Sequence, residues 1–339
     1  MSTAPERSLD KTVLLFFEGP ERDKLFRGDR HIRRRIKPLV WKLARGHWKV
    51  GFQVSFEALV RGLTACGYTV QVNDRRTALE HPEHPVGVCG FPHILNDWDL
   101  PNPTILGPGL FDHPGQAPHL MDDPRFRRYV VRSQWMLELF QPYYADRCFI
   151  WFAGTDIERW PDARTHTKEF DFLVYDKVRW NREERERELI RPILAALERR
   201  GLRYTRLRYG AYRLPEYRRL LERSQAMLFL CEHENQGNAC HEALASNVPV
   251  LAWDQGFWLD PILHRFSDEP VPASSVPWFS GECGDRFRNI DEFESVLDRF
   301  LSQLPKYRPR AFVESTLSLE RSGEIYAREY FAQARRDRT

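Results

Sequence analysis

The sequence predicts an α/β protein with two domains, each built around a parallel β-sheet. Its 339 residues suit two domains of about 150 residues better than a single core. Short apolar runs of strand length alternate along the chain with segments that have the period of an amphipathic helix, which is typical of βαβ units. A hydrophobic content of 42% and an aromatic content of 13% exclude a disordered chain.

The first half of the chain predicts an open sheet with ligand-binding loops. The first strand is the continuous apolar run at residues 12–17, TVLLFF. The other elements expected here are a helix over 54–66 that Gly67 caps, a second helix over 134–143, and strands over 68–72, 85–90, 103–106, 129–132 and 148–152. Loops at the carboxyl ends of such strands bind ligands, which places His93 and the pair Asp112-His113 near the predicted site. We favour His93 over His113, although an isolated histidine is more often structural.

The second half predicts another sheet after a polar linker at residues 161–168. Its expected elements are strands over 170–175, 202–208, 226–231 and 248–253, helices over 183–200, 215–222, 291–304 and 317–334, and an irregular surface segment over 267–285. Pro192 should kink the first of these helices, and Gly201 ends it. We therefore expect an N-terminal domain over residues 1–162, a C-terminal domain over 163–316 and a final helical segment over 317–339.

A basic insert at residues 21–50 carries eleven lysines and arginines against three acids, although the net charge of the chain is only +3. One interpretation is a solvated helix held by its apolar stripe. The other is a surface helix that contacts anionic lipid or a charged acceptor, which Trp41 and Trp48 favour slightly. Nucleic acid is a weaker candidate partner, because no recognised binding motif accompanies the charge.

The rest of the composition predicts a soluble, cytoplasmic protein, with peripheral contact at the inner membrane surface if the insert binds lipid. No run of 18 apolar residues occurs, and no apolar leader precedes the first strand. The six cysteines are scattered without a Cys-x-x-Cys pair. This distribution argues against a disulfide scaffold or a zinc site and fits a reducing compartment.

The stretch at residues 226–253 carries the most specific chemistry. It reads as a strand, a loop, a short helix that begins near Gly237, and a second strand. Unpaired N–H groups of Gly237, Asn238 and Ala239 at that helix start could bind a pyrophosphate. Glu234 lies in the loop, and Glu242 follows about one helical turn after the helix start, roughly 6 Å along the axis. The two carboxylates could therefore hold opposite ends of a sugar nucleotide; the alternative is an acidic cap and an exposed glutamate.

This stretch resembles the Glu-x7-Glu segment of glycosyltransferase family 4, retaining enzymes of the GT-B architecture. The resemblance implies two Rossmann-like domains facing a cleft, with a final helix that crosses back to the N-terminal domain. It also implies that Glu234 meets the donor sugar, that the amides at 237–239 meet the diphosphate, and that Glu242 meets the ribose. The family usually reads Glu-Gly-Phe-Gly, whereas this chain reads Glu-Asn-Gln-Gly at 234–237. The phosphate-facing glycine is kept, and the identity of the sugar is left open.

Other family features match more loosely. Lys177 and Arg182 have the spacing, in reversed order, of an Arg and a Lys that the family aims at the diphosphate, with Arg179 between them; the alternative is a basic solvated turn. Gly51 matches a glycine-rich loop that faces donor and acceptor, and a histidine near the position of His93 contacts the sugar in the family. The string AGTDIERWPD at 153–162 resembles the signature that closes the first domain.

The function implied is retaining transfer of a sugar from a nucleoside-diphosphate sugar to a sugar, lipid-linked or other hydroxyl acceptor, in glycan, polysaccharide or glycolipid synthesis. No metal and no cofactor besides the donor co-substrate is expected. The sequence Asp97-Trp98-Asp99 has the form of a metal-binding Asp-x-Asp, but so short a match is common in a chain with 48 acidic residues, and we interpret it as a turn. The alternatives are a nucleotide-sugar epimerase or phosphorylase on the same scaffold, and a non-catalytic scaffold that binds anionic surfaces.

Overall fold

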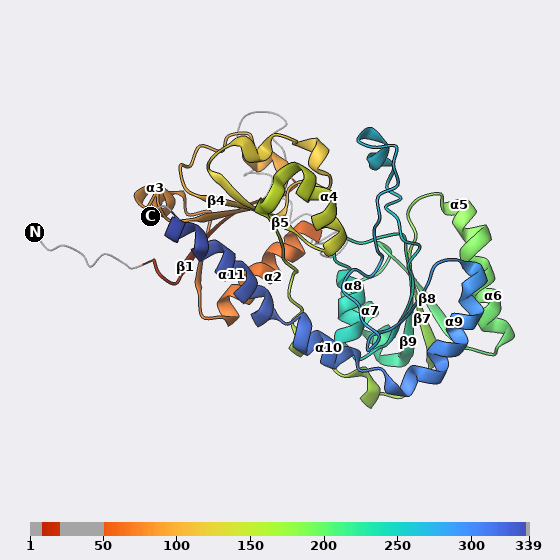
Figure 1. Ribbon diagram of the computed structural model, residues 1–339. Coiled ribbons are helices and arrows are strands. Elements are labelled where there is room, and N and C mark those ends of the chain that lie inside the picture. The colour runs from red at the N-terminus through yellow and green to blue at the C-terminus, as the bar shows by residue number, and fades with distance from the viewer. Residues whose placement is uncertain (1–8, 21–50, 337–339) are drawn as a thin grey trace, which may run out of the picture. The chain divides into compact units, whose positions relative to one another are not determined.

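The computed structural model describes residues 9–20 and 51–336, and within them the chain forms two compact units (Figure 1). The first unit takes the described residues up to Arg132, then Leu137–Gly154, and the residues from Leu319 onward. The second unit takes Ser133–Met136 and Thr155–Ser318. The basic insert at 21–50 and its predicted surface contact lie outside the described residues.

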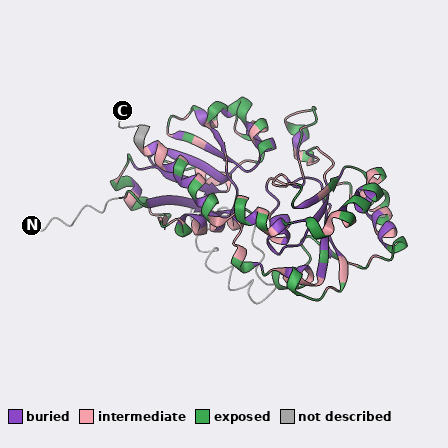
Figure 2. Cartoon of the chain, turned by 60° about the horizontal axis from the view of Figure 1, so that its bottom comes forward, coloured by how far each residue is buried: buried purple, intermediate pink, exposed green. Residues whose placement is uncertain are grey.

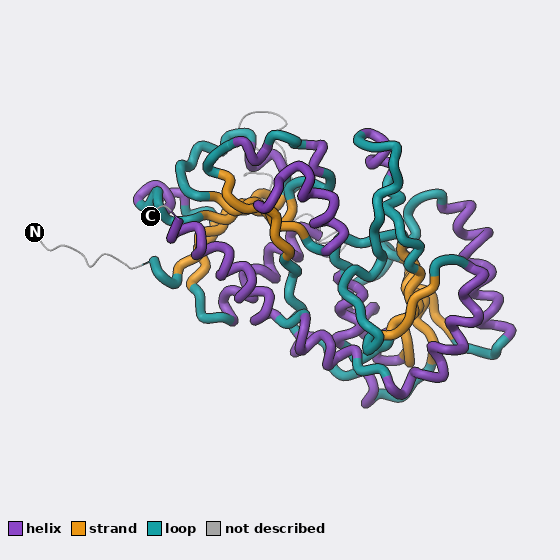
Figure 3. The backbone as a smooth tube through the Cα atoms, in the orientation of Figure 1, coloured by secondary structure: helices purple, strands orange, loops and turns teal. Residues whose placement is uncertain are grey.

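The first unit is built on a parallel sheet of six strands in the order β2-β1-β3-β4-β5-β6. The strands are β1 (Thr12–Glu18), β2 (Thr69–Val72), β3 (Val86–Gly90), β4 (Thr104–Gly109), β5 (Phe126–Val131) and β6 (Cys148–Ile150). The helices are α2 (Gly51–Ala65), α3 (Arg75–Glu80), α4 (Gln134–Tyr144), whose first three residues belong to the second unit, and α11 (Leu319–Arg336). Strand β1 is buried over almost its whole length because helices cover parallel sheets on both faces, which explains its uninterrupted apolar sequence (Figure 3).

Helix α11 belongs to the core of the first unit, although it comes from the far end of the chain. It crosses α2 at two glycines so closely that a Cβ on Gly323 would lie 2.3 Å from the carbonyl oxygen of Gly62. Further along α11, the buried Tyr330 hydroxyl accepts a hydrogen bond from the Leu14 N–H at 2.9 Å and donates to the carbonyl of Pro85. The helix is therefore fixed both to α2 and to the sheet.

The second unit is built on a parallel sheet of five strands in the order β11-β10-β9-β7-β8. The strands are β7 (Phe170–Lys177), β8 (Tyr204–Arg208), β9 (Ser224–Cys231), β10 (Val250–Trp253) and β11 (Gly284–Phe287). The helices are α5 (Arg182–Arg185), α6 (Arg191–Arg199), α7 (Leu214–Arg223), α8 (Asn238–Ala245), α9 (Ile290–Gln303) and α10 (Pro309–Thr316). Figure 2 shows that the central strands of both sheets are buried and the outer faces of the helices are exposed, whereas the edge strands β2 and β8 are partly exposed.

The two faces of this second sheet carry different helices, and β7 alternates between them. Phe172 and Val174 pack into one apolar cluster with residues of α6 and α9. Tyr175 points to the other face, where its ring packs against Tyr217 of α7 and Phe229 of β9. This alternation decides which side chains at the end of β7 can meet.

The prediction of one kinked α-helix over residues 183–200 is wrong, because the structure has two α-helices here. A π-helical segment, Glu186–Ile190, separates α5 from α6. Pro192 lacks an N–H group and cannot complete the ladder of α-helical hydrogen bonds, and a wider turn before it accommodates this loss.

Strand β11 and helix α10 are absent from the predicted elements. Gly284 allows β11 to approach β10 closely, since a Cβ there would lie 1.9 Å from the Val250 carbonyl oxygen.

All six cysteines are free thiols, five of them buried. Among the helices that the structure describes, none has the length and apolar character needed to span a membrane.

Because a methyl group on Gly323 would collide with the backbone of α2, we expect Gly323→Ala to lower the free energy of unfolding by about 1–3 kcal/mol. Gly281→Ala is the matched control, since a Cβ at Gly281 meets no atom within 4 Å. Chemical denaturation of both variants measures the difference. Equal stability of Gly323→Ala and the wild type would contradict the tight crossing of α2 and α11.

Candidate functional site

The candidate site of the second unit lies at the carboxyl ends of β7 and β9. These strands are neighbours, and their last residues, Lys177 and Cys231, pair directly. The turn after β7 (residues 178–181) and the loop after β9 (residues 232–237) therefore lie side by side. Both loops contain residues that the sequence singled out.

Helix α8 begins as the sequence predicted, with Gly237 immediately before its first residue. Gly237 has the left-handed conformation, φ 89°, which glycine adopts without strain. The buried Gln236 side chain donates a hydrogen bond to the Asn238 side chain at 3.0 Å and lies 3.5 Å from the ring of His241, which anchors the loop to the helix start. Among the described residues, the N–H groups of Asn238 and Ala239 have no acceptor. They are free to bind an anion.

Glu242 lies on α8 beside the tyrosines of α7 and the segment before it. Burial raises the pKa of Glu242 to about 8, although the charges of Arg218 and Arg159 act in the opposite direction. Burial, and then the charge of Glu242, also raise the pKa of Tyr217, whose hydroxyl donates to the Ala239 carbonyl at 2.5 Å. Within the described chain the Glu242 carboxyl makes no hydrogen bond or ion pair. Near neutral pH it holds its proton and can both donate and accept a hydrogen bond.

Lys177 and Glu234 form an ion pair by direct contact of Nζ and Oε1, with only 12% and 14% of their side chains exposed. The ring centroid of Tyr209 lies 4.5 Å from the ammonium group. Burial acts to lower the pKa of Lys177, but the negative charge of Glu234 outweighs it, and the pKa is raised above its usual value. The structure thus brings these two predicted site residues together.

Glu232 is a residue that the sequence interpretation missed. It is fully buried, and its Oε1 accepts hydrogen bonds from the backbone N–H groups of Arg179 at 2.7 Å and Trp180 at 3.0 Å. The Arg179 guanidinium lies 4.0 Å from the centroid of the Trp180 ring, which stacks in parallel on His233 at 5.1 Å. Arg179 therefore lies on the outside of this stack. The sequence feature that could have identified Glu232 is its position directly after a buried apolar strand, where ligand-binding loops of parallel sheets begin.

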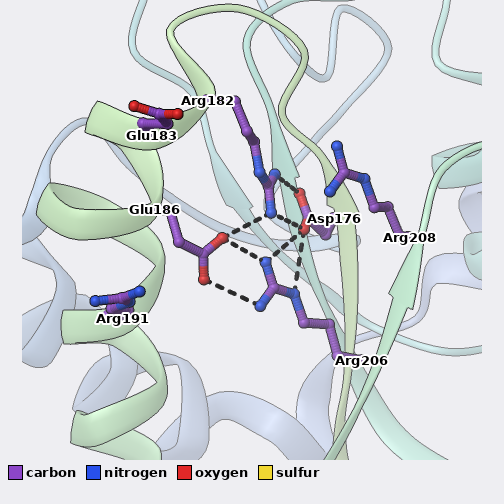
Figure 4. Close-up of a pocket in the computed structure, with 7 residues that line it drawn as sticks. All are labelled: Asp176, Arg182, Glu183, Glu186, Arg191, Arg206 and Arg208. Atoms are coloured by element: carbon purple, nitrogen blue, oxygen red, sulfur yellow. Dashed lines mark hydrogen bonds and ion pairs between the residues drawn. The ribbon is translucent and has the colours of Figure 1, made fainter.

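Arg182 lies on the opposite side of β7 from Lys177. Its guanidinium binds both carboxylate oxygens of Asp176 at 2.6 Å, and it contacts Glu186 at 2.7 Å. Arg206 of β8 binds the same two acids, so that the two guanidiniums converge on the fully buried Asp176 (Figure 4). Burial acts to raise the pKa of Asp176, but the two arginines outweigh it and hold the pKa below its usual value. The structure therefore separates Arg182 from the Lys177–Glu234 pair.

The Asp176 network forms the base of an open pocket of about 600 Å³, which Arg191 and Arg208 also line. Asp176 follows Val174 on the face of the sheet that carries α6, whereas Lys177 follows Tyr175 on the face that carries α7. The pocket is thus distinct from the start of α8.

In the first unit, the predicted residues follow the carboxyl ends of β3 and β4 or begin α2. Gly51 is the first residue of α2 and is exposed, and no atom of the described residues lies within 4 Å of the position of a Cβ. His93 lies partly buried in a short 3-10 turn, Pro92–Leu95, with its ring 6.2 Å from that of Phe91. His113 is buried, and its Nδ1 accepts a hydrogen bond from the Gly115 N–H at 2.9 Å, which is a structural cap. Burial also lowers the pKa of His113.

The Asp97-Trp98-Asp99 segment follows that 3-10 turn, as predicted for a loop. Asp99 forms an ion pair with Arg75 at 2.5 Å. In the described part of the chain, no three His, Cys, Asp or Glu side chains are grouped so that they could hold a metal ion.

The raised pKa of Glu242 predicts a pH dependence of stability. Between about pH 4.5 and pH 8 the unfolded carboxyl has lost its proton while the folded one keeps it, so the free energy of unfolding falls as the pH rises. Glu242→Gln cannot ionise and removes this loss. We expect its free energy of unfolding, relative to that of the wild type, to be roughly 2 kcal/mol higher at about pH 8.5 than at about pH 5; this figure is reduced to allow for the partial exposure of the Glu242 side chain. Denaturant titrations at both pH values measure the gain, with the exposed Glu158→Gln as control. A constant difference across this range would refute the raised pKa.

Comparisons with known proteins bear on the fold. No protein-family model matches the chain, and no curated protein matches it. Among solved structures, AviGT4, a glycosyltransferase involved in avilamycin A biosynthesis, is 12% identical with a TM-score of 0.52, and the match covers 95% of this chain and 97% of that one. TarM is also 12% identical, with a TM-score of 0.50 over 73% of this chain, which spans about half (54%) of TarM. At this identity the likeness concerns the fold alone, and it confirms the predicted class: two Rossmann-like α/β domains, as in GT-B proteins.

Proposed function

We propose that this protein is a glycosyltransferase that moves a sugar from a nucleoside-diphosphate sugar to a hydroxyl acceptor, with retention of configuration and without a metal. The observation that carries the proposal is the arrangement around α8: N–H groups without acceptors among the described residues at its start, Lys177 of β7 paired with Glu234 in the loop before it, and a second carboxyl, Glu242, on the helix. The fold shared with AviGT4, a glycosyltransferase, supports the same proposal.

The start of α8 is the proposed diphosphate site. The N–H groups of Asn238 and Ala239 and the positive end of the helix dipole attract phosphate oxygens, and the left-handed Gly237 leaves no side chain in their way. Lys177 adds a full positive charge in a largely desolvated position, where it stabilises the charge that builds on the leaving group. Arg182 is given a supporting role, because its contact with Asp176 holds the turn that follows Lys177.

Glu242 is the proposed ribose ligand. Its protonated carboxyl offers one donor and one acceptor, which matches a pair of neighbouring ribose hydroxyls. Glu234 is the proposed ligand of the sugar hydroxyls. Neither carboxylate is required as a general base in this scheme, because an oxygen of the departing phosphate can take the proton of the acceptor.

For the first unit, the proposal keeps the roles that the family resemblance gives: His93 for the sugar, and Gly51 for the backbone that faces donor and acceptor. Glycan, polysaccharide or glycolipid synthesis is the proposed setting. Arg179, stacked on Trp180, is proposed as a further cation near the donor.

The test is a screen of nucleotide sugars for protection against thermal unfolding. A ligand at a hundredfold excess over its dissociation constant stabilises the fold by about 2.7 kcal/mol, which is easily measured. We expect one nucleotide sugar to protect the wild type, and Glu242→Ala to weaken its binding at least tenfold, because a buried hydroxyl loses its partner. Glu158→Ala is the control.

The nucleotide sugar so identified is then incubated with candidate acceptors, and the configuration of the new glycoside is read by NMR. Retention is expected. The proposal fails if no nucleotide sugar protects the protein, or if the donor sugar is epimerised without any acceptor.

A further inference from the structure

The ion pair between Lys177 and Glu234 joins two groups that the proposed function assigns to different parts of the donor. The lysine is assigned to the diphosphate and the glutamate to the sugar, yet without donor they neutralise each other by direct contact. The pair has few other partners: the Cys231 thiol, 3.7 Å from Glu234 Oε1, is only a weak donor, and the Tyr209 ring covers the ammonium group.

We propose that this ion pair makes the site select the complete nucleotide sugar over the nucleoside diphosphate that remains after transfer. The inference rests on the proposed function and adds a specificity that the function alone does not require. Its basis is the competition between a phosphate and Glu234 for the same ammonium group.

A diphosphate can bind Lys177 only by taking it from Glu234. The Glu234 side chain is only 14% exposed in the ion pair, so the released carboxylate has little water to solvate it and a new anion close by. A complete nucleotide sugar relieves this cost, because its hydroxyls donate hydrogen bonds to the carboxylate. A nucleoside diphosphate lacks the transferred sugar and its hydroxyls, and therefore leaves Glu234 without a partner.

Glu234 cannot avoid the competition by moving its backbone. Its N–H donates to the Ser274 carbonyl at 2.9 Å, and its carbonyl accepts a hydrogen bond from the indole of Trp135 at 3.0 Å. Lys177 is fixed as the last residue of β7. The exchange of partners therefore requires movement of the two side chains alone.

The same competition favours product release. Once the sugar has left, Glu234 regains its attraction for Lys177 and displaces the diphosphate from it. The ion pair thus weakens the binding of the nucleoside diphosphate more than that of the nucleotide sugar.

Isothermal titration tests the inference with UDP, GDP, ADP, CDP and dTDP and with a matching nucleotide sugar of each. We expect the wild type to bind a complete nucleotide sugar more tightly than its nucleoside diphosphate. In Glu234→Gln, which is nearly isosteric and uncharged, we expect the nucleoside diphosphate to bind about tenfold tighter than in the wild type, while the nucleotide sugar gains little or loses affinity. Lys177→Met should weaken both ligands.

Three controls separate the causes. Glu234→Asp keeps the charge and should keep the preference for the nucleotide sugar, whereas Glu234→Ala removes the charge and should shift the preference in the same direction as Glu234→Gln. Glu158→Gln, which changes a charge elsewhere on the surface of the second unit, should bind as the wild type does.

Two outcomes are distinguishable. If the wild type binds a nucleotide sugar but Glu234→Gln and Glu234→Ala bind the nucleoside diphosphate no more tightly than the wild type does, the inference is overturned and the proposed function stands. If the wild type binds none of these ligands, the proposed function fails and the inference fails with it.

Discussion

The register of β7 against β9 is the constraint on which the candidate site depends. Lys177 pairs with Cys231, and this pairing brings the lysine side chain to the loop that carries Glu234. Side chains alternate along a strand, so a slip of one residue would turn Lys177 to the face of α6 and bring Asp176 to the face of α7. The apolar residues before them prevent such a slip, because Val174 and Tyr175 would exchange faces as well.

Buried carboxylates hold the turn that follows β7 from both sides. Asp176 accepts the backbone N–H of Val178 at 3.2 Å and binds the Arg182 guanidinium, while Glu232 of the neighbouring loop accepts the N–H groups of Arg179 and Trp180. Both acids are buried and accept hydrogen bonds, although in the described part of the chain only Oε1, and not Oε2, of Glu232 has donors. Removal of a donor would leave a buried carboxylate with less compensation. These contacts fix the backbone of the short turn that follows Lys177.

Much of the fold follows from sequence patterns, and part of the site does. The buried parallel strands appear as continuous apolar runs, and Gly237 before a run of small residues marks the start of α8. Two kinds of feature depend on contacts that a linear pattern does not contain. The ion pair of Arg182 with Asp176 depends on which face of β7 each side chain occupies. The role of Glu232 depends on a neighbouring strand more than fifty residues away in the chain. Pro192 predicts an irregularity in the helix, but the sequence does not indicate that this irregularity is a π-helical segment.

The crossing of α11 over α2 has a consequence for synthesis on the ribosome. The sheet of the first unit emerges early, but α11, which packs against α2 and β1, is translated only after the whole second unit. During translation the second unit can complete its core first, while the nascent first unit waits with an apolar face that its own C-terminal residues will later occupy. The core of the first unit can therefore be completed only after the residues of the second unit have been made.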